Sequence, residues 1–213
     1  MSLKPPKIIL ASTSIRRHEI LKLLGLPFET RAPRYEEESL EELTPYEEAL
    51  RFSIEKSKSL ASLYPDSILI GSDTLLEFKG EKIGKPQNFE HALEILKKLR
   101  GDTHDILTGV CLLNAKTHEI KSGIEIIQVK MKNYSEGEIK NYIEKDKPFD
   151  KAGAYALQGE GKKLIESLKG DYLAAVGLPL RFIAAALREF GVLMPRDVEQ
   201  IYQEKKLMNW KEY

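Results

Sequence analysis

The feature that most constrains the fold is a short apolar run, a polar loop and a helix that follow one another at the start of the chain. Residues 8–10 are Ile-Ile-Leu, a run suited to a buried strand, and the Ser-Thr-Ser cluster at 12–14 can cap a helix that begins at Ile15. A strand that leads through a tight loop into a helix favours a fold in which helices pack on a sheet.

The first turn of this helix carries the wrong charge for a bare helix terminus. Unpaired N–H groups there attract acidic residues, yet Arg16 and Arg17 occupy the turn. An external anion such as phosphate, held by backbone N–H groups, the Ser12 and Ser14 hydroxyls and a guanidinium, would satisfy the local rule. An ordinary cap by Ser14 beside two solvated arginines explains the same residues, so this stretch leaves both interpretations open.

The composition is that of an ordinary globular protein with balanced charge. The 213 residues include 33 Lys and Arg and 33 Asp and Glu, so any polyanion must meet a local cluster of basic residues. The single Cys111 lies in an apolar run and fits a buried thiol in a reducing compartment. Because no signal peptide or membrane-length apolar span occurs, we expect a cytoplasmic protein that binds neither nucleic acid nor a membrane.

Helix and strand signals alternate in the first half of the chain, and hairpins follow. Capping patterns predict helices after Thr44, Asn88 and Ser135. Apolar runs predict strands over 67–78 and 103–113, the latter turning into a partner that continues to about residue 132. This order predicts an α/β fold with a mixed β-sheet flanked by helices.

Two further predictions concern the end of the chain. Residues 163–168 and 171–176 are expected to form a hairpin about Lys169 and Gly170. Residues 195–213 are expected to form one amphipathic helix with no chemistry of its own.

A carboxylate in the middle of an apolar strand is the second informative feature. Asp is disfavoured in a strand interior, and burying an unpaired carboxylate costs several kcal/mol. Asp73 therefore needs a cation, a metal ion or a catalytic cleft, unless a bend between two short strands leaves it at an exposed turn. Lys56 lies beside the apolar stripe of the preceding helix, where it extends to solvent or meets an anion. Lys85 follows a hairpin turn that brings it close to the Asp73 strand.

Several familiar sites are excluded by inspection. The sequence has no GxxxxGK[ST], GxGxxG, HExxH, CxxC or GxSxG motif, and its four histidines have no metal-ligand spacing. What remains is a set of basic residues and a set of carboxylates on segments that could converge. That mixture suits a nucleoside triphosphate with Mg²⁺ or Mn²⁺, because cations offset the phosphate charge while carboxylates hold the metal ion and orient a water. The two sets are Arg16, Arg17, Lys56 and Lys85, and Asp73 with 36–38.

A resemblance to a known family rests on six motifs that occur in a fixed order. The motifs are Ala11–Arg17, Ser72–Thr74, Gly84–Pro86, Thr108–Gly109, Asp150–Gly159 and Val176–Leu180. In this order they resemble the Maf-like nucleoside triphosphate pyrophosphatases, from about Ile8 to Gly191. The resemblance implies a fold like that of Maf and inosine triphosphatase proteins, with an elongated mixed sheet and a nucleotide cleft between two lobes. It implies a single domain over 1–194, with 195–213 as a helical tail packed on it or extending from it.

The resemblance also implies hydrolysis between the α and β phosphates, which depends on Mg²⁺ or Mn²⁺ and gives a nucleoside monophosphate and pyrophosphate. Asp73 resembles the family's general base or metal carboxylate, and Glu37 a second metal ligand. The residues that resemble its phosphate site are Ser12, Arg16, Arg17, Lys56 and Lys85, and those that resemble its substrate-choice positions are Arg16, Thr74 and Gln158.

The stretch that ends in Gln158 resembles the dTTP and UTP pyrophosphatases within this family. A Gln amide offers one donor and one acceptor side by side, which matches O4 and N3–H of thymine or uracil, whereas guanine would favour a carboxylate. We therefore expect dTTP, UTP or modified forms of them as substrates. Two departures from the family pattern are Ile15, where Pro is common, and the all-Glu run at 36–38, where an Asp-Glu pair is more usual.

The sequence leaves a second class of function open. A nucleotide-binding regulatory protein, acting through a partner in division control, would carry the same binding residues, with hydrolysis incidental. Pyrophosphate release from a panel of triphosphates separates the two functions. A homodimer is also left open.

Overall fold

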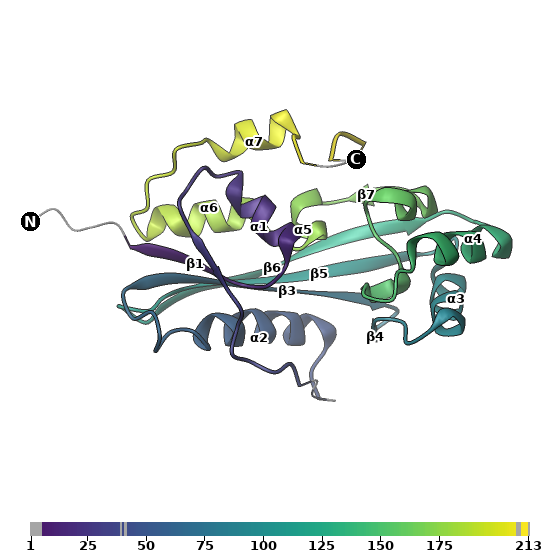
Figure 1. The fold of residues 1–213 in the computed structure, drawn as a ribbon, viewed down its shortest axis with the longest axis horizontal. Helices are drawn as coiled ribbons and strands as arrows, with labels where there is room; N and C mark the ends of the chain where they lie inside the picture. Colours follow the sequence, from purple (N-terminus) through teal and green to yellow (C-terminus); the bar gives the residue numbers. More distant parts are fainter. Residues whose placement is uncertain (1–5, 39, 41, 208–209, 213) are drawn as a thin grey trace, which may run out of the picture.

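A mixed β-sheet runs along the length of the molecule (Figure 1). The computed structural model describes residues 6–38, 40, 42–207 and 210–212. Within them the strand order is β2-β1-β3-β5-β6-β7, with β4 paired to β3. Strand β1 is parallel to β2 and β3, and the other pairs are antiparallel. The strands are β1 (Lys7–Ala11), β2 (Glu29–Arg31), β3 (Ser67–Phe78), β4 (Glu81–Ile83), β5 (Thr103–Asn114), β6 (Glu119–Met131) and β7 (Ile165–Lys169).

Helices cover both faces of this sheet, as predicted. Helix α2 lies on one face, α1, α5 and α6 lie on the other, and α3 and α4 lie at the far end (Figure 1). The α-helices are α1 (Ile15–Lys22), α2 (Pro45–Lys58), α3 (Phe89–Leu99), α4 (Glu136–Asp146), α5 (Tyr172–Val176), α6 (Leu180–Glu189) and α7 (Val198–Glu204). The 3₁₀ helices are η1 (Ala152–Ala154), η2 (Gly159–Leu164) and η3 (Trp210–Glu212). In the described part of the chain, no helix is both long enough and apolar enough to cross a bilayer.

The predicted helix starts are confirmed by their caps. The Ser14, Thr44, Asn88 and Ser135 side chains each accept a hydrogen bond from a backbone N–H in the first turn of the helix that follows. These bonds satisfy donors that would otherwise lack partners at the helix termini.

Two glycines allow α2 to lie unusually close to the sheet. A Cβ atom on Gly71 of β3 would lie 2.2 Å from the Ser53 carbonyl oxygen, and one on Gly109 of β5 would lie 2.3 Å from the Ala49 carbonyl oxygen. Since real Cβ atoms do not approach backbone oxygens this closely, only glycine fits at both positions. The close approach brings the side chains of α2 down to the surface of the sheet.

Side chains that alternate along the central strands enter two different apolar clusters. Ile70 and Leu112 pack in the larger cluster with α1 and α6, while Leu69 and Leu113 pack in a smaller one with Leu60, just after α2. Burial on both faces explains why these strands are nearly continuous apolar runs in the sequence.

The predicted hairpin over 163–168 and 171–176 is wrong. Strand β7 pairs with β6, and residues 172–176 form helix α5 instead of a partner strand. The Asp171 carboxylate caps this helix by accepting hydrogen bonds from the N–H groups of Leu173 and Ala174 at 2.8 and 3.4 Å. A short apolar run suits a buried helix as well as a strand, so periodicity alone could not separate the two.

The predicted single helix over 195–213 is too long. Helix α7 ends at Glu204, where Lys205 adopts a left-handed conformation with φ of 44°, and η3 follows at 210–212. The prediction over 208–209 and at 213 lies outside the described residues. Val198 and Ile201 are buried and supply the apolar face of α7.

Candidate active site

A cavity of about 740 Å³ opens at the edge of β3, beyond the end of β1. Strand β1 pairs with residues 67–70 of β3 and β4 pairs with residues 76–78, so the edge of β3 between these stretches is open to the cavity. Ligands of open α/β sheets commonly bind where neighbouring strands diverge in this way. The nine site residues predicted from the sequence all line this cavity: Ser12, Arg16, Arg17, Glu37, Lys56, Asp73, Thr74, Lys85 and Gln158.

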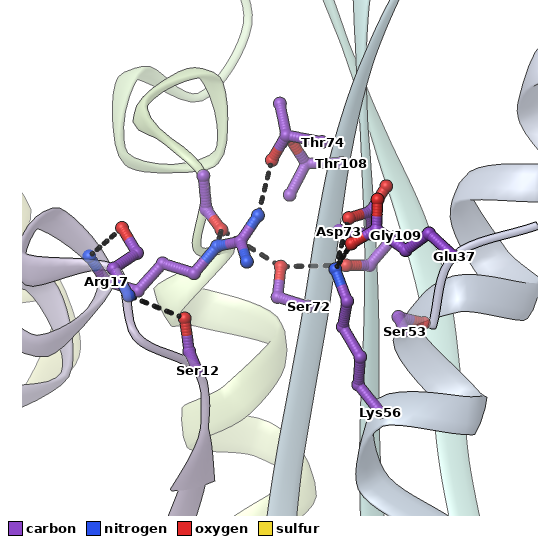
Figure 2. A network of polar contacts seen from close by, with 12 residues as sticks. Ser12, Arg17, Glu37, Ser53, Lys56, Ser72, Asp73, Thr74, Thr108 and Gly109 are labelled. Carbon is purple, nitrogen blue, oxygen red and sulfur yellow. Dashed lines mark hydrogen bonds and ion pairs between the residues drawn. The ribbon is translucent and has the colours of Figure 1, made fainter. Parts of the chain in front are cut away.

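Arg17 extends from α1 to the edge of β3 (Figure 2). Its Nε donates to the Gly177 carbonyl at 3.0 Å and its Nη2 donates to the Thr74 hydroxyl at 3.3 Å. Burial lowers the pKa of the Arg17 guanidinium from its ordinary value, while the charges of Asp73 and Glu37 oppose that shift. A guanidinium held in place within a partly buried wall is preorganised to bind an anion.

The start of α1 combines features of both interpretations, the ordinary Ser14 cap and the anion site. Ser14 does cap α1, accepting from the Arg17 N–H at 3.4 Å, as the ordinary interpretation requires. The Arg17 side chain is not solvated but bonded within the cavity wall, whereas Arg16 is exposed at the same cavity. The pair therefore places two positive charges on one ligand-sized space.

Lys56 bridges two carboxylates on the α2 side of the sheet (Figure 2). Its Nζ lies 2.6 Å from Asp73 Oδ1 and 2.6 Å from Glu37 Oε1. Asp73 is only 5% exposed and Lys56 only 6%, whereas half of the Glu37 side chain is exposed. Because β3 continues without a break through Asp73, which pairs with Gly109, the alternative of an exposed turn is excluded. Lys56 is the cation that a buried Asp73 requires.

Neighbouring residues of β3 serve opposite faces of the sheet. Asp73 faces Lys56 of α2, while Thr74 faces Arg17 of α1. Side chains alternate along a strand, so this arrangement follows directly from their adjacent positions. The open strand edge therefore joins a face that carries the carboxylates to a face that carries the guanidinium.

The donor set around Asp73 fits a hard divalent cation. Asp73 Oδ2 is buried and has no hydrogen-bond partner among the described residues, and Glu37 supplies a second carboxylate on the same Lys56 ammonium. In the described part of the chain, no group of three or more His, Cys, Asp or Glu side chains is placed to hold a metal ion. Mg²⁺ commonly binds through one or two carboxylates together with substrate phosphates and water, so two carboxylates suffice.

The charge of the cavity differs from that of the whole chain. Its lining includes six basic side chains and three acidic ones, an excess of three positive charges in a protein whose formal net charge is zero. A local positive excess in a concave site attracts an anion. The six basic residues are Arg16, Arg17, Lys56, Lys82, Lys85 and Lys151.

Lys82 and Lys151 are cavity residues that the sequence interpretation missed. Lys82 Nζ lies 2.5 Å from Oε2 of Glu48, a buried carboxylate on α2, and Lys151 Nζ lies 2.5 Å from the Asp150 carboxylate. Lys82 pairs with Glu77 across the hairpin. Its side chain therefore faces the same way as Asp73, and hairpin register was the signal that could have found it.

Tyr155 forms part of the cavity wall, and its hydroxyl shares a hydrogen bond with His104. The His104 Nε2 lies 2.7 Å from the Tyr155 hydroxyl, while His104 Nδ1 is buried without a partner among the described residues. Burial lowers the pKa of His104 from 6.5 to about 4. The imidazole is therefore neutral in the folded protein at pH 7.

This buried imidazole predicts a loss of stability in mild acid. The unfolded chain takes up a proton on His104 below pH 6.5, but the folded protein resists it down to about pH 4. The contribution of neutral His104 to the free energy of unfolding is thus fully present above pH 6.5. About 3 kcal/mol of it is lost as the pH falls to 4. We expect urea unfolding of His104→Gln to depend less on pH than that of the parent protein. If the free energy of unfolding changed equally with pH in the parent and the variant between pH 7.5 and 4.5, His104 would not be the group responsible.

The family model and the relatives in sequence agree on one family. The model of the family described as Maf-like protein matches residues 7–190. A dTTP/UTP pyrophosphatase of Dictyoglomus thermophilum is 41% identical over 87% of this chain and 96% of that protein. One of Syntrophus aciditrophicus is 38% identical over 88% of this chain and 91% of that protein. Among solved structures, a HAM1 protein from Coxiella burnetii is 14% identical, covering 61% of this chain and 75% of that chain, with a TM-score of 0.41.

Proposed function

Because the chain belongs to the Maf-like protein family, we propose that it is a nucleoside triphosphate pyrophosphatase that hydrolyses dTTP and UTP. The products would be the nucleoside monophosphate and pyrophosphate. The observation that carries the proposal is the buried Asp73 carboxylate, one oxygen of which has no partner among the described residues, in a ligand-sized cavity with an excess of positive charge. Such a cavity suits a triphosphate, and Asp73 would act as a general base beside its phosphates.

The basic residues would bind and orient the triphosphate. Arg17 is already fixed by two hydrogen bonds, so it would bind phosphate oxygens without first losing side-chain freedom. Arg16, Lys85 and the Ser12 hydroxyl line the same space and would complete the phosphate site. The charges of the arginine and lysine side chains would offset the negative charge of the triphosphate, which otherwise disfavours nucleophilic attack.

Asp73 would act on the attacking water. Its Oδ1 is bonded to the Lys56 ammonium, which leaves Oδ2 to accept a proton or to orient the water beside the α phosphate. Lys56 would hold the carboxylate in one orientation through its hydrogen bond to Oδ1.

Glu37 and Asp73 would hold Mg²⁺ or Mn²⁺ together with the substrate's phosphates. When bound, the metal ion supplies electrostatic stabilisation of the phosphate oxygens. Glu37 is half exposed and lies on a loop outside the helices and strands, so its carboxylate can turn from Lys56 toward such an ion.

Gln158 and Thr74 would select the base. Gln158 lines the cavity, and its amide pairs one donor with one acceptor, the pattern that O4 and N3–H of uracil or thymine require. Guanine presents O6 and N1–H and adenine presents N1 and N6–H, so the amide alone would not reject a purine. Selection against purines would come from the larger bicyclic ring, which would displace the amide from its hydrogen-bonding position.

A panel of triphosphates tests the proposal. With Mg²⁺ or Mn²⁺ present, we expect dTTP and UTP to release pyrophosphate with kcat/KM about tenfold or more above GTP and ATP, because a base too large for the space beside Gln158 misplaces the reacting phosphates. Chelation with EDTA should remove the activity. Pyrophosphate release from no member of the panel would overturn the proposal and favour the nucleotide-binding regulatory protein.

A further inference from the structure

The C-terminal segment, beyond the residues matched by the family model, packs against the wall of the cavity. Trp210 is only 3% exposed, and its ring stacks on that of Tyr172 with centroids 6.0 Å apart and planes 16° apart. Tyr202 of α7 meets the same indole edge-on, at 5.0 Å and 81°. Figure 1 shows this segment, in yellow, over the helical layer that contains α5 and α6. The tail is therefore anchored on α5 by three aromatic rings.

Tyr172 connects this aromatic cluster to the cavity. It is the first residue of α5 and is buried, and its hydroxyl accepts a hydrogen bond from Gln158 Nε2 at 3.5 Å. Gln158 lines the cavity, so a series of direct contacts runs from Trp210 through Tyr172 to Gln158. A shift of the Tyr172 ring would move the hydroxyl that accepts the hydrogen bond from the Gln158 amide.

A second contact fixes α5 itself. The Tyr202 hydroxyl donates to Oδ2 of Asp171, whose other oxygen caps α5. At the opposite end of this helix, the Gly177 carbonyl accepts a hydrogen bond from Arg17 Nε at 3.0 Å. The tail thus supports the N-terminal cap of α5, and the other end of α5 holds the half-buried Arg17 of the cavity.

We propose that residues 195–207 and 210–212 form a clamp that sets the base preference of the cavity, with Trp210, Tyr202 and Tyr172 as residues that position Gln158. The inference rests on the proposed function, because it takes Gln158 to be the residue that contacts the base. Aromatic rings have few rotatable bonds and large contact areas, which suits them to holding a neighbour in one place. A purely structural tail would contribute to stability alone.

Binding of nucleotides that cannot be cleaved tests the clamp apart from catalysis. Dissociation constants for α,β-methylene UTP and α,β-methylene GTP would be measured by calorimetry for the parent, Trp210→Leu and Tyr172→Phe. We expect each variant to lose about threefold to tenfold of the preference for the uridine nucleotide, the effect of one weakened hydrogen bond. Trp210→Phe keeps an aromatic ring and should retain the preference within about twofold.

A double-mutant cycle separates positioning from general destabilisation. If Trp210 acts through Gln158, then Trp210→Leu in a Gln158→Ala background should change the preference by less than about twofold. Leu113→Ala removes buried apolar surface from the smaller core cluster, which does not include Tyr172 or Trp210, so it should lower stability while leaving the preference unchanged. An unchanged preference in Trp210→Leu, or an equal loss in Leu113→Ala, would overturn the clamp.

These binding measurements, together with the pyrophosphate-release assay, distinguish this inference from the proposed activity. A parent protein that prefers the uridine nucleotide but releases no pyrophosphate would contradict the pyrophosphatase and leave the clamp tested on its own. A parent that binds neither nucleotide would overturn both.

Discussion

Asp73→Asn is expected to reduce kcat by roughly 10² to 10⁴, the usual contribution of a positioned general base, while UTP still binds. The amide has nearly the shape of the carboxylate but cannot accept a proton. It also removes a negative charge that repels phosphate, so the dissociation constant for UTP should stay the same or fall. Steady-state kinetics and calorimetry on one preparation would measure both effects.

Asp105→Asn provides a matched control for this substitution. Asp105 lies on the neighbouring strand β5, opposite Glu77 and outside the cavity lining. The same chemical change there should leave kcat within about twofold, as expected for a residue distant from the reacting atoms. An Asp73→Asn protein with near-parental kcat would remove Asp73 from the mechanism.

Gly109→Ala is expected to lower both stability and activity. The new Cβ would lie 2.3 Å from the Ala49 carbonyl oxygen, which belongs to the helix backbone and cannot rotate away. Forced overpacking of this kind costs about 3 kcal/mol. As α2 moves off the sheet, Lys56 would lose its contacts with Asp73 and Glu37, so turnover should fall by about tenfold or more, as for a misplaced catalytic group.

Gly137→Ala is the control for this second substitution. Gly137 lies in α4, where a Cβ would approach nothing closer than the Ser135 hydroxyl at 3.9 Å. Alanine should leave stability unchanged or raise it by about 0.5 to 1 kcal/mol, because it restricts the unfolded chain. Urea unfolding and kcat would be measured for both variants. A Gly109→Ala protein as stable and active as the parent would show that the close approach of α2 has no such role.

The sequence predicted the parts of the site in which local chemistry conflicts with local structure. Arg17 in a helix first turn and Asp73 in an apolar strand both break a rule of the element they occupy, so each required a partner from elsewhere. The sequence could say that Lys56 meets an anion, but not that the anion is Asp73. That pairing depends on the distance of α2 from the sheet, which two glycines determine.

Where residues followed the usual preferences of their elements, the sequence either predicted the wrong element or gave no signal for the site. The run after Asp171 suits a strand or a buried helix equally, and only the cap on Leu173 and Ala174 decides between them. Lys82 looks like an ordinary turn lysine until the β3–β4 register gives its face. The single domain over 1–194, the homodimer and the metal ligands stay predictions.

The opposed directions of Asp73 and Thr74 determine where this chain can change length. Loops at the sheet ends can lengthen at small cost, because the ends of a flexible loop close with only a slowly growing entropy penalty. One residue inserted into β3 before Asp73 would turn every later side chain of the strand to the other face. The carboxylate would then leave Lys56 and meet Arg17. The number of residues in β3 is therefore constrained more tightly than the lengths of the loops at its ends.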